Sequence, residues 1–454
     1  MSFIPTSLMP QLSWPAIRGD GTAQLMAVLY QLNLSQYWRP KQLEAAQFAQ
    51  LKFLVQHAVR YSPFYSELFS KNKVDIPEHF NQESWGNLPI VSRRQLQEAA
   101  SKAVCSEVPE HHVKGSSHVT SGSTGQPLSI ISTNITQMFW QAITLRDHLW
   151  HSRDLKGKLT IIRDPKGAKL RNGFKSMNSW GPPADKICPT GKAQFITSNT
   201  PVNRQLEILS EINPDYLLTY PTNLSALIRE SLLRGVKLVN LKEVRTLGEI
   251  VFPTLRTLCM EAWGVNVVDN YSCQEGGYLA LQCPIHSHMH VQSETVKVEI
   301  LNDNNQPCEP GETGRVVLTS LHNFVNPIIR YEIGDYATVG EPCSCGRGLP
   351  VLNQIHGRVR NMMHHPNNVL TWPNINNKRL YEVEGLKQFQ IIQVSVKKVQ
   401  FHYVSDMDLT KEQFHVCEEI IRDCLSYKYE IEWLRKDSIE RAKGGKHEDF
   451  KSLI

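Results

Sequence analysis

The stretch His118-Val119-Thr120-Ser121-Gly122-Ser123-Thr124-Gly125-Gln126-Pro127 is the most informative part of this sequence. Four hydroxyl side chains and two glycines fall within Thr120–Gly125. Glycine permits the positive φ angles that turn backbone N–H groups toward one point, and hydroxyls add donors, so the loop suits a polyphosphate. It is not a phosphate loop of Walker type, because no Gly-Lys-Ser/Thr follows. The alternating residues Leu128–Ser132 predict strand, loop and strand, and the alternative is a flexible Ser/Gly linker.

The composition bounds the class of protein. With 454 residues and 41% hydrophobic content, the chain can bury a sizeable core, and its length indicates two or three domains. The net charge of +5 predicts no nucleic-acid partner and suits anionic substrates. No apolar run approaches the about 20 residues of a membrane span, and the N-terminus shows no secretory signal. We therefore expect a cytoplasmic protein without a membrane partner.

The ten cysteines are expected to be mostly reduced core thiols, with closely spaced ones as metal candidates. Cys417 and Cys424 are seven residues apart and lie on one face of the last predicted helix.

The chain is predicted to begin with helices, up to about residue 105. Gln42–Arg60 has apolar residues at helical spacing, and Ser92–Ala103 is a helix that Ser92 caps. After the glycine-rich loop, Thr133–His151 is a long helix. Short strands then alternate with helices, which is typical of an α/β domain with a largely parallel sheet. The expected strands are Leu159–Ile162, Tyr216–Tyr220, Val244–Leu247 and Val265–Val268, and the helices are Asn203–Glu211, Thr222–Arg234 and Pro253–Trp263.

The helices stop after Tyr271, and a small β subdomain is predicted around the strands Thr295–Leu301 and Gly314–Thr319. From Gly357 onward we expect a small α+β domain. Its elements are strands within Phe389–Val404, a helix over Thr410–Leu425 and a strand at Ile431–Leu434. The predicted domains are 1–356, divided into a helical lead-in (1–105), an α/β part (106–270) and a β subdomain (271–356), and then 357–454.

Two segments that directly follow strands suit a nucleotide site. Gly248-Glu249 would border the crevice at the carboxyl ends of a doubly wound sheet. In the segment Asn270–Glu275, Tyr271 can stack on a base and Glu275 can help to hold Mg²⁺, which favours one or two carboxylates together with phosphates. Taken alone, Gly248-Glu249 is better explained as a turn that ends a strand, and the alternative for the second segment is a solvated turn.

Three further residues are candidates for the nucleotide site. Asp335 can accept ribose hydroxyls, although an Asp at a turn commonly caps its own backbone. Arg358, after Gly357, can meet a ribose or a phosphate. Lys446, on a glycine turn near the C-terminus, can bridge a carboxylate and a phosphate, although such a lysine is usually solvated.

In order and spacing, these segments resemble the adenylate-forming (ANL) superfamily of acyl-CoA synthetases, peptide-synthetase adenylation domains and luciferases. Within it, the chain looks most like the branch of phenylacetate–CoA ligase and CapK-type proteins. The resemblance runs from about residue 40 to the end. It rests on four motifs, which are Thr120–Pro127, Asn270–Glu275, Ile329–Asp335 and Gly357-Arg358.

The resemblance implies the ANL fold, with a mobile C-terminal domain, and an enzyme that uses ATP and Mg²⁺. It would activate a small carboxylic acid, with an aryl acid as the weak preference, as acyl-AMP with release of pyrophosphate. Transfer to a thiol of CoA or an acyl carrier protein would follow. The implied catalytic residues are Lys446 and Glu275, the latter at Mg²⁺. The implied nucleotide-binding residues are Thr120, Ser121, Gly122, Ser123, Thr124, Gly125, Gly248, Glu249, Asn270, Tyr271, Ser272, Gln274, Asp335 and Arg358.

The chain departs from the family pattern in several places. Gln274 stands where Thr is usual, Ser272 where Gly is usual, and Arg360 where the hinge is Asp or Lys. The segment His364–Asn368 lacks the glycine turn of CoA ligases. These departures bear on CoA as acceptor more than on adenylation, so transfer to an amine is one alternative. A non-catalytic scaffold is another, although Lys446 argues against it. A homodimer is left open.

A structural zinc site is predicted from residues that flank the β subdomain. Zinc prefers four Cys and His ligands in a closed tetrahedron. The phenylacetate-ligase branch often has a Cys, His and Cys-x-Cys arrangement, which Cys283, His290, Cys343 and Cys345 match. His286 and His288 compete with His290, and Cys308 is a weaker candidate. The alternative is a set of reduced thiols and surface histidines.

Overall fold

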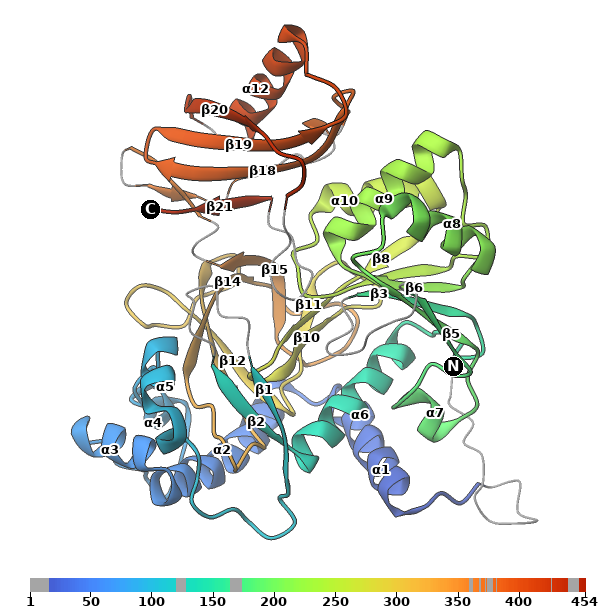
Figure 1. The fold of residues 1–454 in the computed structure, drawn as a ribbon. Helices are drawn as coiled ribbons and strands as arrows, with labels where there is room; N and C mark the ends of the chain where they lie inside the picture. The colour runs from blue at the N-terminus through green and yellow to red at the C-terminus, as the bar shows by residue number, and fades with distance from the viewer. Residues whose placement is uncertain are drawn as a thin grey trace. The chain divides into compact units, whose positions relative to one another are not determined.

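The computed structural model describes residues 16–119, 128–163, 174–358, 362–366, 369–371, 373, 379–380, 382–425, 427–439 and 449–454 (Figure 1). The chain forms two compact units. The first contains residues 1–158, 176–193 and 269–355, and the second contains 159–175, 194–268 and 356–454.

The first unit begins with helices, as predicted. The helix predicted over Gln42–Arg60 is confirmed as α2, which buries Leu51, Leu54 and Val55. Ser92 caps α5 and its Oγ accepts the backbone N–H of Gln95 at 3.3 Å. The predicted helix to Ala103 changes to a 3₁₀ turn at Ala100, whose φ of 45° cannot continue an α-helix. The elements are α1 (Asp20–Ser35), α2 (Pro40–Tyr61), α3 (Pro63–Lys71), α4 (Gln82–Gly86), α5 (Arg93–Ala99) and η1 (Ala100–Ala103).

Two paired strands flank the glycine-rich loop. β1 (Lys114–Val119) and β2 (Ser129–Thr133) are antiparallel, with Val119 opposite Ser129, which confirms the predicted strands. The loop residues Thr120–Pro127 lie outside the described residues. α6 (Asn134–Trp150) starts directly after β2, because Thr133 Oγ1 accepts the N–H of Thr136 at 3.1 Å.

A seven-stranded sheet forms the centre of the first unit, in the order β12-β13-β14-β15-β11-β10-β9. It contains the two strands predicted for a small β subdomain, but it is larger. Helices α2 to α5 lie beside β12 to β14 (Figure 1), and their side chains share one core with this sheet. The strands are β9 (Asn270–Cys273), β10 (Gly277–Gln282), β11 (Met289–Val291), β12 (Val296–Leu301), β13 (Thr313–Ser320), β14 (Tyr331–Val339) and β15 (Val351–Arg358).

The second unit contains the predicted α/β alternation. Its six-stranded sheet has the order β4-β5-β3-β6-β7-β8. The neighbouring pairs β3 and β6, β6 and β7, and β7 and β8 are parallel. Helices α8 to α10 pack on this sheet through a core that includes Leu209, Leu224 and Cys259. The elements are β3 (Leu159–Arg163), β4 (Phe174–Met177), β5 (Ala193–Thr197), α8 (Val202–Ile212), β6 (Tyr216–Thr219), α9 (Pro221–Arg234), β7 (Glu243–Thr246), α10 (Pro253–Trp263) and β8 (Asn266–Val268). A short helix, α7 (Ala184–Ile187), belongs to the first unit.

The C-terminal segment has the α+β character that was predicted. A four-stranded sheet, in the order β20-β19-β18-β21, packs against α12 around a core of its own. Cys417 and Cys424 are buried on α12, as predicted. The domain limits themselves, including the boundary at residue 357, stay a prediction. The elements are β16 (Met363–His364), β17 (Leu370–Thr371), β18 (Leu386–Ser395), β19 (Lys398–Ser405), α12 (Lys411–Leu425), β20 (Glu430–Arg435) and β21 (Phe450–Ser452).

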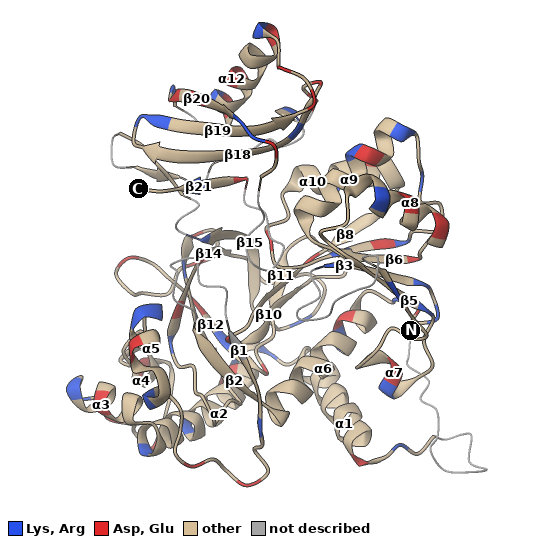
Figure 2. Cartoon of the chain, in the orientation of Figure 1, with Lys and Arg blue, Asp and Glu red and all other residues tan. Residues whose placement is uncertain are grey.

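Within the described ranges, no helix is both long and apolar enough to cross a membrane. Lys and Arg are interspersed with Asp and Glu along the helices (Figure 2). All ten cysteines belong to the described part of the chain, and none of them is paired in a disulfide.

A buried arginine fixes the point at which β14 begins. Arg330 is 2% exposed, has a φ of 44°, and makes an ion pair with Glu299 at 3.1 Å. Its Nη1 also donates to the carbonyl oxygens of Trp85, Gly86 and Leu88, where α4 ends. The guanidinium therefore ties the N-terminal helices to the sheet, which periodicity in the sequence does not reveal.

We expect Arg330→Met to lower the free energy of unfolding by about 3–5 kcal/mol, because it leaves Glu299 buried without its cation. Urea unfolding followed by tryptophan fluorescence measures this loss. The control is Arg94→Gln, which breaks an exposed ion pair with Glu98 and should change nothing measurable. Equal midpoints for the two variants would contradict the assigned role.

Candidate active site and metal centre

The first feature of the site is a hydrogen bond between two of the predicted motifs. Tyr271, on β9, donates its Oη to Oδ2 of Asp335, on β14, at 2.8 Å. In the sheet order, β14 and β9 are four steps apart, which would separate them by roughly 19 Å in a flat sheet at about 4.8 Å per strand. The sheet must therefore curl, and this curvature brings the two predicted nucleotide residues together.

Glu275 lies in the turn between β9 and β10 and is 7% exposed. Its Oε1 is 3.4 Å from Nη1 of Arg93, the first residue of α5, and the same Nη1 is 3.4 Å from the hydroxyl of the buried Tyr331. Burial, together with the negative charges of Glu275 and Asp335, raises the pKa of the Cys273 thiol well above its usual value. The carboxylates of Glu275 and Asp335 therefore both lie in the part of the sheet that contains Cys273.

This region fits a magnesium ion that accompanies a nucleotide. Mg²⁺ takes one or two carboxylates and completes its shell with phosphate oxygens and water. Glu275 offers a buried carboxylate whose ion pair among the described residues, with Arg93 at 3.4 Å, is longer than a tight charge-assisted hydrogen bond. We therefore keep Glu275 as the predicted Mg²⁺ residue.

The neighbouring predicted residues share the β9 strand and its turn. Ser272 Oγ is 3.3 Å from Oδ1 of Asn270, and Gln274 is exposed. Gly276, which follows Glu275, has no room for a side chain, since a Cβ would lie 2.8 Å from Leu318 Cδ2. Its N–H donates to Cys273 Sγ at 3.2 Å, which closes the turn that presents Glu275.

The other predicted nucleotide residues that are described belong to the second unit. Gly248 has a φ of 75°, and the Glu249 carboxylate accepts the N–H and the Oγ1 of Thr222, at 3.0 and 2.9 Å, at the start of α9. Arg358 is the last residue of β15 and follows Gly357, whose φ is 81°. Convergence of these residues with Tyr271 and Asp335 on one nucleotide stays a prediction. Lys446 and Arg360, like the loop Thr120–Gly125, lie outside the described residues.

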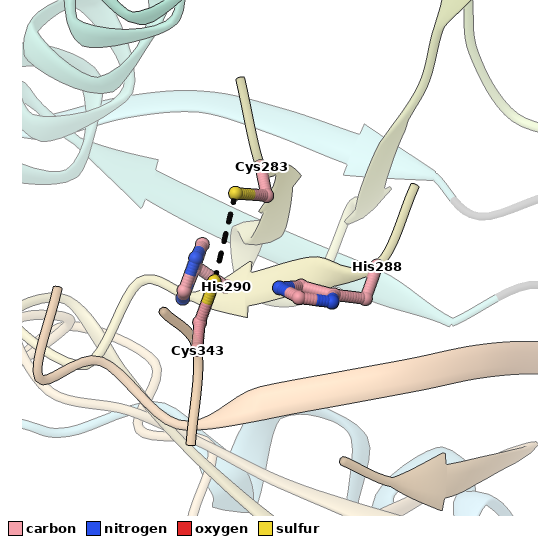
Figure 3. Close-up of side chains that lie close together, drawn as sticks. All are labelled: Cys283, His288, His290 and Cys343. Atoms are coloured by element: carbon pink, nitrogen blue, oxygen red, sulfur yellow. Dashed lines mark hydrogen bonds between the residues drawn. The ribbon is translucent and has the colours of Figure 1, made fainter. Parts of the chain in front are cut away.

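A cluster of cysteine and histidine side chains lies at the other end of β10. Donor atoms of Cys283, His288, His290 and Cys343 are all within 4.8 Å of one another (Figure 3). Three of these are predicted zinc ligands, and the fourth, His288, was a competing candidate. The remaining predicted ligand, Cys345, has its Sγ 3.3 Å from Nε2 of His290.

The chemistry of these donors fits zinc. Nε2 of His288 is buried and has no hydrogen-bond partner among the described residues, which is costly unless a ligand satisfies it. Burial lowers the pKa of His290 to about 4, so its imidazole is neutral at neutral pH, as a metal ligand must be. His290 Nδ1 is 3.4 Å from the carbonyl oxygen of Leu349, which leaves Nε2 facing the cysteines. His286 instead pairs with Ser344 at 3.0 Å.

The loop that carries Cys343 and Cys345 packs against the C-terminal ends of α1 and α6. Arg347 stacks on Trp150 at 4.4 Å and donates to Gln36 at 2.9 Å. Gly348 must be glycine, because a Cβ there would lie 1.8 Å from the carbonyl oxygen of Trp38. A metal at this cluster would therefore link the sheet to the end of α1 and to α6.

Comparison with known proteins agrees with this architecture. No protein-family model matches the chain. A phenylacetate-coenzyme A ligase from Aromatoleum evansii is 24% identical over 336 residues, which are 71% of this chain and 72% of that protein.

Solved structures extend the similarity to nearly the whole chain. A 2-hydroxyisobutyryl-CoA ligase in complex with R3-HIB-AMP matches with a TM-score of 0.71 and 18% identity, over 92% of this chain and 90% of that chain. The same ligase with 2-HIB-AMP and CoA has a TM-score of 0.59 and 18% identity, over 91% and 90% of the two chains. An anthranilate CoA ligase with anthranoyl-AMP has a TM-score of 0.53 and 16% identity, over 73% and 65%. The chain thus has the fold of these ligases, which agrees with the fold that its resemblance to the adenylate-forming (ANL) superfamily implies, and it is distantly similar in sequence to a phenylacetate-coenzyme A ligase.

Proposed function

We propose that this protein is an ATP-dependent acid–thiol ligase that forms an acyl-AMP and then a CoA thioester. The observation that carries the proposal is the direct hydrogen bond between Tyr271 and Asp335, which joins two nucleotide motifs predicted separately from the sequence. The fold that the chain shares with a 2-hydroxyisobutyryl-CoA ligase solved with an acyl-AMP and CoA supports it.

The proposed first step is attack of a substrate carboxylate oxygen on the α-phosphorus of ATP. A P–O bond forms to the acid, the bond from the α-phosphorus to the bridging oxygen breaks, and pyrophosphate leaves. Two anions react, so the barrier is largely electrostatic, and positioned donors and cations lower it. Tyr271 and Asp335 would hold the nucleoside, and Glu275 would hold Mg²⁺, which supplies positive charge to the phosphates. Lys446 is the proposed cation between the acid and the phosphate.

In the proposed second step, a thiolate sulfur attacks the acyl carbonyl and AMP leaves. CoA, an acyl carrier thiol and an amine are the acceptors to be compared. The amine is kept as an alternative to CoA because the sequence His364–Asn368 lacks the glycine turn of CoA ligases. We also propose a structural zinc ion, which Cys283, His290 and Cys343 hold together with either His288 or Cys345.

Exchange of radiolabelled pyrophosphate into ATP, with a panel of small acids that includes aryl acids, tests the first step. We expect exchange with at least one acid, and Lys446→Ala should abolish it because the transition state loses its cation. Lys428→Ala, an exposed lysine of the same segment, is the control and should exchange normally. Normal exchange by Lys446→Ala would remove the lysine role, and no exchange by the natural protein would favour a scaffold. CoA or amines are then added to identify the acceptor.

Tyr271→Phe should raise the KM for ATP about tenfold while the KM for the acid changes little. The ring remains, but Asp335 loses a donor to its charged oxygen, an interaction of about 1.5–3 kcal/mol. Steady-state kinetics with the most active acid measures both constants. Tyr336→Phe, on the strand that carries Asp335, is the control. Equal constants for the two variants would show that the hydrogen bond does not serve nucleotide binding.

The zinc proposal predicts roughly one zinc ion per purified chain by mass spectrometry. Cys283→Ser and Cys343→Ser should lose most of it and melt at lower temperature, because bound metal stabilises the folded state. Cys308→Ser should keep the metal, since Cys308 lies outside the cluster. Comparing His288→Ala with Cys345→Ser identifies the fourth ligand. Zinc retained at the natural level by the Cys283 and Cys343 variants would refute the site.

A further inference from the structure

Arg93 is the residue outside the predicted motifs that contacts the Mg²⁺ carboxylate. Its Nη1 is 3.4 Å from Oε1 of Glu275 and 3.4 Å from Oη of Tyr331. The side chains of Arg93 and Glu275 are 19% and 6% exposed, so the pair is screened from bulk water. Because it is partly buried, this ion pair can orient a carboxylate in a way that an exposed pair cannot.

The backbone around Arg93 is fixed to the strand that carries Asp335. The N–H of Val91 donates to the carbonyl of Arg330 at 2.8 Å, and the N–H of Glu332 donates to the carbonyl of Val91 at 2.9 Å. Ser92 then caps α5, and Arg93 is its first residue. The guanidinium is therefore anchored on the same sheet as both carboxylates of the site.

We propose that Arg93 is a positioning residue that holds the Glu275 carboxylate in the orientation that receives Mg²⁺ with ATP. This inference rests on the proposed function. The distance of 3.4 Å exceeds the about 2.7–2.9 Å of a tight charge-assisted hydrogen bond, so Arg93 directs the carboxylate without sequestering it. The hydroxyl of Tyr331 accepts from the same Nη1 at 3.4 Å and helps to hold the guanidinium in place. Loss of such a supporting partner typically weakens metal binding ten- to a hundredfold.

The chain provides a matched control in the next residue. Arg94 lies on the same helix, is 86% exposed, and pairs at 2.7 Å with Glu98, which is also exposed. Arg94→Gln therefore removes the same charge from the same turn without touching Glu275. Arg93→Gln removes the orienting cation, and Arg93→Lys keeps the charge but changes its reach and geometry.

The test is a titration of each purified variant with Mn²⁺ in the presence of α,β-methylene-ATP, with free Mn²⁺ followed by electron paramagnetic resonance. We expect the dissociation constant of Mn²⁺ to rise about tenfold in Arg93→Gln, about threefold in Arg93→Lys, and not at all in Arg94→Gln. In pyrophosphate exchange, the Mg²⁺ concentration that gives half of the maximal rate should rise across the variants in the same order. Excess Mg²⁺ should restore the maximal rate.

Unchanged Mn²⁺ affinity in Arg93→Gln overturns the inference, as does a rate that falls equally at every Mg²⁺ concentration. If circular dichroism shows that Arg93→Gln is unfolded, Arg93→Lys decides, and natural affinity in that variant overturns the inference. The failure of the proposed function is distinguishable, because it would appear as Mn²⁺ and nucleotide binding by the natural protein without exchange for any acid. Absence of Mn²⁺ binding by the natural protein overturns the assignment of Arg93.

Discussion

The site depends on the requirement that a carboxylate buried in a folded chain be paired. The buried Glu275 meets it through Arg93, and the partly buried Asp335 accepts a hydrogen bond from the hydroxyl of Tyr271. Neither partner is close in sequence, so each pairing imposes a condition on the fold. Tyr271 reaches Asp335 only if the seven-stranded sheet curls, and Arg93 reaches Glu275 only if α5 is attached to β14. The geometry of the nucleotide residues is thus a consequence of how this sheet and the N-terminal helices pack.

The strand β10 connects the two chemical sites of the first unit. Glu275 precedes it and Cys283 follows it, a separation of roughly 26 Å along an extended chain at about 3.3 Å per residue. A zinc ion at Cys283 would therefore fix one end of the strand whose other end presents Glu275, the proposed Mg²⁺ carboxylate. The Cys343 loop, docked on Trp150 through Arg347, would transmit the same constraint to α6. A structural metal at this cluster would thus support the proposed active site although it lies far from the chemistry.

The sequence predicted those features that depend on local periodicity or on a motif. The helix over Gln42–Arg60, the cap at Ser92 and the parallel strands agree with the structure because each is decided within a few residues. The sequence did not predict β14 as a strand, since its polar residues Glu332, Gly334 and Asp335 interrupt the alternation. It also missed the partners Arg93 and Arg330, whose contacts with Glu275 and Glu299 join residues far apart in the chain. His288 was only a competing ligand, because spacing cannot rank three histidines that alternate along one segment.

In the proposed reaction, activation of the acid and choice of the acceptor depend on different parts of this chain. Tyr271, Glu275 and Asp335 belong to the first unit, where Tyr271 pairs with Asp335 and Glu275 pairs with Arg93. The departures that bear on the acceptor include Arg360 and His364–Asn368, which follow β15 and lead to the C-terminal sheet. Under the proposed function, the described residues of the sheet bear on the first half-reaction, and the segment after β15 bears on the choice of acceptor.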